Sequence, residues 1–425
     1  MIRNSTLIVL LIGYLLPPML AQTDKPNPWA GKTEEDMRRI ADSLAQAFII
    51  ADGHVDLPYR LVTKNFRPTK EFIGIPVESA EGDFDYVRAK KGGLDAPFMS
   101  IYIPSSYQET GGAKAFADSL IDMVRTIAEA HPDKFNIATS PRHLTSIKRS
   151  GRIALPMGME NGAPIENDLK NVEYFRNRGI SYITLTHGKD NQICDSSYDT
   201  TGTWNGLSPF GREVIKEMNR VGIMVDISHV SDSAFYQAVR LSRAPCIASH
   251  SSARRFTPSF KRNMSDDMIR YLGQRGGVIM INFGSGFLDE KVRRNEEKKR
   301  AELLELLDKK GLTYRDSAAQ PIIENFRNAN PSLYANVERV VDHIDHVVRI
   351  AGINHVGFGS DFDGVGDSLP TGLKDVSQYP NVIYELIKRG YSAPDIEKIC
   401  SGNLIRVWQE VEAMSRRLNV KKSKP

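Results

Sequence analysis

The stretch ADGHVDLP, which runs from Ala51 to Pro58, carries a histidine and an aspartate on either side of a single valine. It continues an apolar run that begins at Ala47, and this run predicts a buried strand over residues 48–56. Successive side chains of a strand point to opposite faces, so His54 and Asp56 project from the same face. Two side chains of types that commonly bind metal ions are therefore expected together at the end of the first strand.

Seven further runs of apolar or β-branched residues follow this strand, with amphipathic helical patterns between most of them. The eight expected strands are FIIADGHVD (48–56), FMSIYIP (98–104), RIALPMGMEN (152–161), SYITLTHG (181–188), GIMVDISHV (222–230), CIASHSS (246–252), GVIMINFG (277–284) and HVGFGSDFDG (355–364). The expected helices span Lys114–Glu129, Asp168–Arg178, Pro209–Arg220, Asp232–Leu241, Ser265–Gln274, Asp289–Lys310 and Tyr334–Ala351. Eight buried strands alternating with helices predict an α/β fold, a (β/α)8 or TIM barrel with insertions, and residues 58–95 are expected to form a long loop.

The first residues have the pattern of a targeting segment. Residues 1–21 combine a lone arginine, an apolar stretch and a terminal alanine, which predicts a secretory signal peptide. Beyond it we expect an N-terminal segment over residues 22–44, a single barrel domain over residues 45–415 and a basic tail over residues 416–425. The apolar stretch is short for a membrane span, and we find no lipidation or GPI signal. We therefore expect an exported protein, periplasmic or secreted, that is soluble and has no stable membrane anchor after cleavage.

Composition restricts both the partners and the kind of site. The net charge is +4, from 56 basic and 52 acidic residues, so nothing points to a nucleic acid partner. Cysteines stand at positions 194, 246 and 400, an odd number that permits at most one disulfide. With so few thiols, a metal site must be built from histidines and carboxylates.

Polar side chains collect where the expected strands end. Seven residues with acid, base or metal-binding side chains fall at six strand ends: His54, Asp56, Glu160, His187, His229, His250 and Asp361. Each of them alone has an ordinary explanation, such as a hydrogen-bonded histidine, a helix cap or a turn-forming aspartate. In a barrel, however, the carboxyl ends of the strands meet at one face, where substrates bind. We therefore expect the seven residues to converge.

The chemistry of this group points to zinc. Imidazole and carboxylate ligands suit Zn²⁺, and a catalytic zinc ion keeps one position open for water. Five of the seven residues are too many ligands for one open tetrahedral site, but they fit two ions if one carboxylate bridges them. Two metal ions can activate a water molecule and polarise the group that it attacks. Asp361, from the eighth strand, is placed to take the proton of that water and pass it to a leaving amine.

The residues around these strand ends resemble those of the membrane dipeptidase (renal dipeptidase) family, whose members are zinc metallopeptidases of the amidohydrolase superfamily. The resemblance covers residues 48–407 and rests on DGHVDLP, GMENG, ITLTH, GLSPFG, MVDISHVSD, ASHSSAR, HVGFGSDFDG and SGNLIRV, in that order. It implies a dizinc dipeptidase that hydrolyses the peptide bond of dipeptides by attack of a metal-bridging hydroxide. In this family a homodimer is common.

The family pattern also implies how the metal ligands divide. His54 and Asp56 would bind one Zn²⁺ ion of the pair. His229 and His250 would bind the other, and Glu160 would bridge the two ions.

The remaining roles concern substrate and protons. By the same resemblance, His187 would contact the substrate and stabilise the oxyanion of the tetrahedral intermediate. Arg262, in the loop after the sixth strand, would pair with the C-terminal carboxylate of the dipeptide, to which a guanidinium fork is well matched. The acid/base residue maps to Asp361, with Asp363 as the alternative.

Two other functions stay open at this point. One is a metal-dependent hydrolase of another small amide or ester, because fold and metals determine the reaction type more firmly than the substrate. The other is a non-catalytic exported binding protein, for which a missing ligand or acid/base residue would be the sign. None of these residues is missing from the sequence.

Overall fold

Eight parallel strands close into a barrel, as the alternating pattern predicts. The computed structural model describes residues 27–64, 77–314 and 316–422, and the expected signal peptide lies outside these ranges. The barrel strands are β1 (Ile50–Val55), β2 (Leu94–Tyr102), β5 (Met157–Glu160), β6 (Ile180–Thr184), β7 (Met224–Asp226), β8 (Ile247–Ala248), β9 (Val278–Ile281) and β10 (Val356–Phe358). They pair in chain order and β10 returns to β1. All eight carboxyl ends therefore lie at the same end of the barrel.

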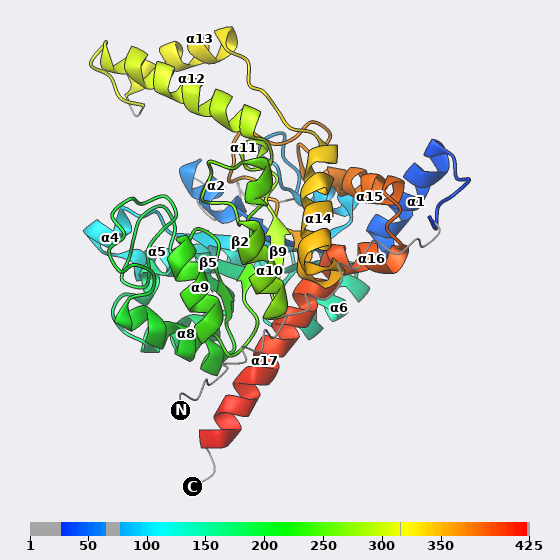
Figure 1. Ribbon diagram of the computed structural model, residues 1–425, viewed down its shortest axis with the longest axis horizontal. Coiled ribbons are helices and arrows are strands. Elements are labelled where there is room, and N and C mark those ends of the chain that lie inside the picture. The colour runs from blue at the N-terminus through cyan, green and yellow to red at the C-terminus, as the bar shows by residue number, and fades with distance from the viewer. Residues whose placement is uncertain (1–26, 65–76, 315, 423–425) are drawn as a thin grey trace, which may run out of the picture.

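Helices surround this barrel, as Figure 1 shows. The α-helices of the described residues are α1 (Glu34–Ala47), α2 (Leu57–Thr63), α3 (Tyr86–Gly92), α4 (Tyr107–Thr110), α5 (Ala113–Ala130), α6 (Pro141–Arg149), α7 (Lys170–Arg178), α8 (Pro209–Val221), α9 (Asp232–Leu241), α10 (Asp266–Gln274), α11 (Ser285–Leu288), α12 (Glu290–Asp308), α13 (Gln320–Ala329), α14 (Val337–Ala351), α15 (Tyr379–Lys388), α16 (Ala393–Glu397) and α17 (Asn403–Lys422). All the expected helices are among them, as α5, α7, α8, α9, α10, α12 and α14. Ser208, Ser231 and Ser265 cap α8, α9 and α10 by accepting a hydrogen bond from the backbone N–H three residues later.

The segment after the first strand is more regular than predicted. Residues 58–95 are not one long loop, because α2 extends into this range as far as Thr63 and α3 lies within it. Pro58 stands in the first turn of α2, where its missing N–H costs no hydrogen bond. Asp85 caps α3 by accepting a hydrogen bond from the N–H of Arg88, and Gly93 ends it with a φ of 76°. Helices of seven residues carry too few turns to give a clear helical period in the sequence.

The expected third strand is split in two. β4 (Ile153–Leu155) pairs with β3 (Phe135–Ile137) in a separate two-stranded sheet, whereas β5 enters the barrel. Pro156 separates them and has no backbone N–H, so it cannot donate to a continuous ladder. Its carbonyl instead accepts a hydrogen bond of 2.8 Å from the N–H of Met99 in β2.

The C-terminal helix is part of the barrel's apolar core. Side chains of α17 pack with the barrel interior, and the ring of Trp408 lies 5.5 Å from the ring of Phe98. Residues 416–422 of the expected basic tail continue this helix. Figure 1 shows α17 running past the body of the protein.

Truncation of Trp408 tests this packing. Trp408 is fully buried, so Trp408→Ala should lower the free energy of unfolding by about 3–5 kcal/mol, through lost burial and a cavity. Trp204→Ala is the control, because Trp204 is 41% exposed and the substitution removes the hydrogen bond that its indole N–H donates to the carbonyl of Asn191. That control should cost about 1 kcal/mol. Urea unfolding measures both, and equal losses would contradict the structural role of α17.

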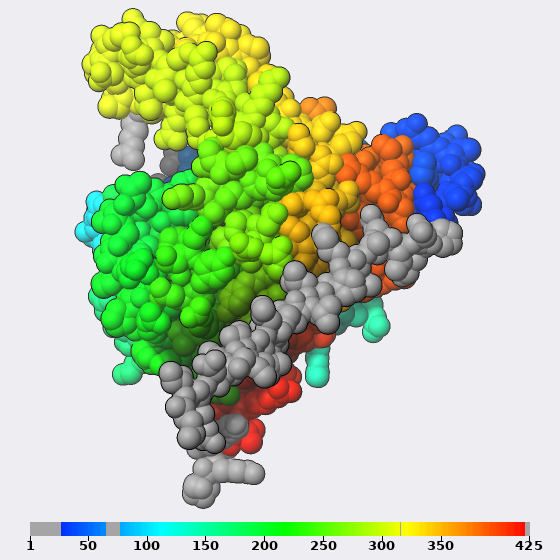
Figure 2. All heavy atoms as spheres, in the orientation of Figure 1, coloured from blue at the N-terminus to red at the C-terminus, as the bar shows by residue number. Residues whose placement is uncertain are grey.

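The two helices α12 and α13 form an arm that stands out from the barrel (Figures 1 and 2). The arm has a small apolar core of its own, made of Leu303, Leu307, Ala319 and Ile323. Most of its charged residues are exposed or partly exposed, whereas Arg293 near the start of α12 is buried.

Two further properties of the described ranges concern the helices and the cysteines. None of the helices in them is both long and apolar enough to cross a membrane. Cys194, Cys246 and Cys400 are free thiols, and all three are buried.

Candidate active site

The carboxyl ends of the strands bring the seven predicted residues toward one end of the barrel. His54 lies in β1, Asp56 begins the turn into α2, and Glu160 is the last residue of β5. His187, His229, His250 and Asp361 stand two or three residues beyond the ends of β6, β7, β8 and β10. Short extensions past a strand end let side chains from several strands reach the barrel axis.

Glu160 is the centre of the group. Its Oε1 lies 2.9 Å from Nε2 of His229, 3.1 Å from Nε2 of His250 and 3.6 Å from Nε2 of His187. Its Oε2 lies 3.4 Å from Nε2 of His54. The carboxylate is buried, and its two oxygens face different sets of histidines. This is the arrangement that a bridging ligand requires.

A second set of ligands continues from His54. Nε2 of His54 lies 3.5 Å from Oδ2 of Asp56, and potential ligand atoms of His54, Asp56 and Asp361 all lie within 4.8 Å of one another. Potential ligand atoms of His54, Glu160 and His250 also lie within 4.8 Å of one another, and so do those of Glu160, His187 and His229.

Several buried atoms of the group fit a cation. Nε2 of His54 and Oδ1 of Asp56 are buried and have no hydrogen-bond partner in the part of the chain that the structure describes, and an unsatisfied buried polar atom costs about 1–3 kcal/mol. The Nε2 atoms of His229 and His250 lie 2.8 Å apart, and both are within 3.1 Å of Oε1 of Glu160, so two imidazole nitrogens and a carboxylate oxygen converge. Metal ions among these nitrogens and carboxylate oxygens would satisfy them together.

The charges of the site follow from burial and proximity. Burial opposes ionisation of Glu160, but His54, His187 and hydrogen bonds from the other two histidines hold its pKa well below the usual value. Burial, followed by the nearby Asp56 carboxylate, raises the pKa of Asp361 to about 7. A carboxyl group of that pKa suits proton transfer near neutral pH.

Two residues of the site have left-handed backbone conformations. His229 has a φ of 68° and Asp361 a φ of 64°. Such conformations are uncommon outside glycine and collect at functional sites, where the surrounding structure holds them.

His187 lies at the edge of the group. Its side chain is 24% exposed, against 6% or less for His54, His229 and His250. Its ring lies 4.2 Å from the ring of His229 and 4.8 Å from that of Tyr102, which it meets edge to face. A group in this position can reach both the metal ligands and a molecule entering from solvent.

Arg262 is a buried cation close to the cluster. Its Nη1 donates a hydrogen bond of 2.6 Å to Oγ of Ser251, and its Nη2 donates one of 2.8 Å to the carbonyl of His250. Within the described ranges Nε has no hydrogen-bond partner although it is buried, and the guanidinium lies over the ring of Phe287. No carboxylate of the described residues forms an ion pair with it at 4.0 Å or less. The site therefore leaves this positive charge available to an acidic ligand group.

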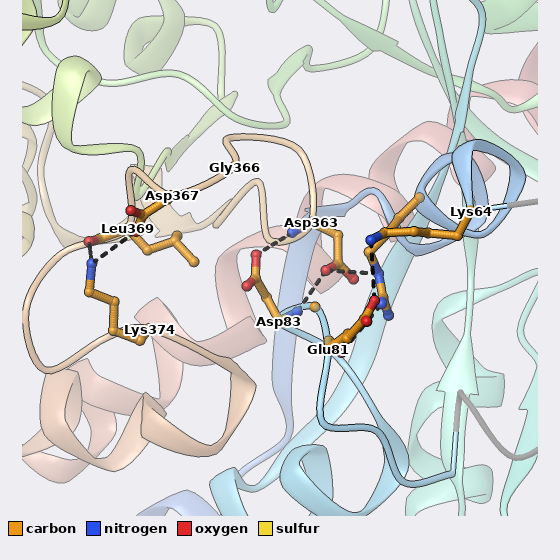
Figure 3. A pocket seen from close by; sticks show the side chains of 10 residues that line it. Lys64, Glu81, Asp83, Asp363, Gly366, Asp367, Leu369 and Lys374 are labelled. Carbon is orange, nitrogen blue, oxygen red and sulfur yellow. Dashed lines mark hydrogen bonds and ion pairs between the residues drawn. The ribbon is translucent and has the colours of Figure 1, made fainter. Parts of the chain in front are cut away.

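The structure separates the two candidates for acid/base catalysis. Oδ2 of Asp361 accepts a hydrogen bond of 2.7 Å from Nδ2 of Asn282, and Asp361 belongs to the metal cluster. Asp363 is engaged elsewhere (Figure 3): it forms an ion pair of 3.0 Å with Nε of Arg60 and accepts a hydrogen bond of 2.7 Å from the N–H of Asp83. It lines a separate cavity of about 460 Å³. This geometry favours Asp361.

Sequence reasoning missed the residues that support the cluster. Oδ2 of Asp226 accepts a hydrogen bond from Oγ of Ser249, whose oxygen contacts Nδ1 of His250. The hydroxyl of Tyr182 contacts Nδ1 of His54. Strand alternation places Tyr182 on the same face as Thr184, toward the barrel axis, and this signal could have identified the tyrosine.

The sequence is similar to known dipeptidases over most of its length. The family profile described as membrane dipeptidase (peptidase family M19) matches residues 38–422. Dipeptidase tcpJ of Claviceps purpurea is 34% identical over 379 residues, which are 85% of this chain and 76% of that protein. Dipeptidase 3 of Rattus norvegicus is 30% identical over 385 residues, which are 88% of this chain and 68% of that protein.

Solved structures agree with this relationship. The probable dipeptidase PvdM from Pseudomonas aeruginosa has a TM-score of 0.74 at 26% identity and covers 89% of this chain and 99% of its own. Dipeptidase AC, an M19 metallopeptidase, has a TM-score of 0.70 at 25% identity and covers 86% of this chain and 98% of its own. With a profile match from residue 38 to residue 422 and these relatives, the chain belongs to the membrane dipeptidase family of metallopeptidases.

Proposed function

We propose that this protein is an exported dizinc dipeptidase. The observation that carries the proposal is the position of Glu160, whose two oxygens face His229 and His250 on one side and His54 on the other. Family membership supports the reaction class. The expected signal peptide over residues 1–21 supports export.

The ligand set follows the division that the family resemblance implies. His54 and Asp56 would hold one ion and His229 and His250 the other, with Glu160 as a ligand that both would share. A zinc pair bound there activates a water molecule at neutral pH and polarises the scissile carbonyl.

The protein's own groups orient the substrate and move the proton. Arg262 binds the C-terminal carboxylate of the dipeptide in a fork geometry, which restricts the distance between that carboxylate and the scissile bond. His187 donates a hydrogen bond to the oxyanion that develops on the carbonyl. Asp361 accepts the proton of the attacking water and delivers it to the leaving amine.

Removal of metal is the direct test of this function. Purified mature protein is expected to hydrolyse dipeptides, to lose activity with a strong chelator, and to regain it with about two zinc ions per chain, as a bridged site requires. Zinc content and ninhydrin detection of released amino acids measure the two properties. Metal-loaded protein that leaves a broad dipeptide panel intact would point to another small amide or ester. Protein that binds no metal would exclude the site, and with it catalysis of this kind.

Substitution of Arg262 tests the recognition of the substrate carboxylate. Arg262→Ala is expected to lower kcat/KM for dipeptides by roughly 100-fold, or about 3 kcal/mol, mainly through KM. Arg262→Lys should recover part of this loss because it keeps the charge but not the fork. Steady-state kinetics measure both variants.

A dipeptide amide serves as the matched control, because it lacks the carboxylate. The wild-type enzyme should hydrolyse this compound poorly, and Arg262→Ala should lower that rate little further. An equal loss on dipeptide and dipeptide amide would mean that Arg262 supports the site through Ser251 and His250 rather than binding substrate.

A further inference from the structure

A chain of hydrogen bonds begins at Asp226, the last residue of β7, and ends at the ring of His250. The Asp226 carboxylate is fully buried. Its Oδ1 accepts hydrogen bonds from the N–H groups of Ser228 at 3.1 Å and Ser249 at 2.9 Å. Its Oδ2 accepts from the hydroxyls of Ser249 at 2.6 Å and Thr184 at 2.5 Å. The Asp226 carboxylate therefore accepts in all four hydrogen bonds, two of them from hydroxyl groups.

This arrangement determines the direction of the next hydrogen bond. The Ser249 hydroxyl has one hydrogen, which it donates to Asp226. Toward Nδ1 of His250, at 2.8 Å, its oxygen can therefore only accept. The imidazole must carry its proton on Nδ1, and a neutral ring then has a free lone pair on Nε2. That nitrogen lies 3.1 Å from Oε1 of Glu160, at the centre of the site.

The neighbouring histidines provide a comparison. The Tyr182 hydroxyl donates to the carbonyl of Gly53 at 2.9 Å, so it accepts from Nδ1 of His54 at 2.8 Å in the same way. Nδ1 of His229 is buried without a hydrogen-bond partner among the described residues. The hydrogen-bond direction is therefore defined for His54 and His250 but not for His229.

We propose that Asp226 is a positioning residue for the metal site, which acts through Ser249 to keep His250 in the Nδ1–H tautomer. The inference rests on the proposed function, because the lone pair on Nε2 matters when that nitrogen binds a metal ion. Groups that orient a metal-binding histidine in this way commonly change metal affinity 10- to 100-fold when they are removed.

The isosteric variant Asp226→Asn makes the proposal testable. The N–H groups of Ser228 and Ser249 retain the amide oxygen at the position of Oδ1, so the amide NH₂ takes the position of Oδ2. There it donates to the Ser249 hydroxyl, which turns and donates to Nδ1 of His250. The ring proton moves to Nε2, and a metal ion must then displace it.

Two measurements other than enzyme activity test this effect of Asp226→Asn. Zinc affinity, measured by competition with a chelating dye, should fall about 10- to 100-fold in Asp226→Asn. Long-range ¹⁵N–¹H spectra of the metal-free protein with ¹⁵N-labelled histidine should show the His250 proton on Nδ1 in the wild type and on Nε2 in the variant.

Rescue distinguishes this role from a structural one. The double variant Asp226→Asn/Ser249→Ala lacks the hydroxyl that imposes the wrong tautomer, so it should bind zinc more tightly than Asp226→Asn alone. Thr184→Val is the control, because it removes the other hydroxyl on the same carboxylate oxygen without touching His250. It should lower stability while leaving zinc affinity near that of the wild type.

Unchanged zinc affinity and tautomer in Asp226→Asn, or a double variant that binds no better than the single one, would overturn the proposal. Wild-type protein that binds no zinc would instead contradict the proposed function. In that case the spectra of the metal-free protein would still show whether Asp226 determines the His250 tautomer, so the two failures are distinguishable.

Discussion

Glu160→Ala protein is expected to keep its fold, bind fewer than two zinc ions per chain and lose dipeptide hydrolysis by about 10³-fold or more. Glu160 contacts His229 and His250 through one oxygen and His54 through the other. Without Glu160, the site loses a charged ligand and the side chain that contacts both His54 and the pair His229 and His250. Zinc analysis of purified protein and steady-state kinetics measure the two effects.

A carboxylate on the surface provides the control for this variant. Glu173 lies on α7, has a side chain that is 54% exposed and pairs with Arg220 at 3.0 Å. Glu173→Ala should keep full zinc content and activity, since exposed ion pairs contribute little. Two zinc ions and normal turnover in Glu160→Ala would show that another residue bridges the ions.

Asp361→Asn is expected to lower kcat by about 10²- to 10⁴-fold while zinc content stays at two per chain. The amide can still accept the hydrogen bond from Asn282, so the local structure is retained. It cannot take up a proton, however, and the reaction loses its acid/base group. Burial and the Asp56 carboxylate already raise the pKa of Asp361 to about 7, which suits that role. Measurement of kcat and KM together with zinc content separates this effect from metal loss.

Asp363→Asn is the matched control, because the same change is made two residues away in another buried carboxylate. It removes the charge that pairs with Arg60 and should therefore lower stability, with kcat close to that of the wild type. The reverse result, with kcat lost in Asp363→Asn and kept in Asp361→Asn, would assign the acid/base role to Asp363.

The strand pattern was sufficient to predict the barrel, but local breaks in it were harder to interpret. Each barrel strand is a short apolar run between polar turns, and burial on both faces makes such runs continuous and easy to recognise. The run over residues 152–161 contains Pro156, which breaks the backbone ladder without interrupting the apolar character. The helices α2 and α3 are too short to show a period. The first error concerns a lost backbone hydrogen bond, and the second concerns the length of the helices.

The candidate site shows a similar division. Histidines and carboxylates at strand ends can be identified in a sequence because the topology of a barrel places every strand end at one face. The supporting groups are harder to find in this way. Strand alternation directs Tyr182 toward the barrel axis and Asp226 ends β7, but neither pattern shows which side chain the residue meets across the barrel.

The sequence by itself determined the barrel, the order of its strands and the set of side chains at their carboxyl ends, because alternation of apolar runs with helices leaves few other arrangements. Tertiary structure alone decided the distances: Glu160 among four histidines, Asp361 inside the cluster with Asp363 outside it, and the hydroxyl of Ser249 between Asp226 and His250. These depend on the twist and closure of strands that are far apart in the chain, and no local pattern in the sequence encodes them.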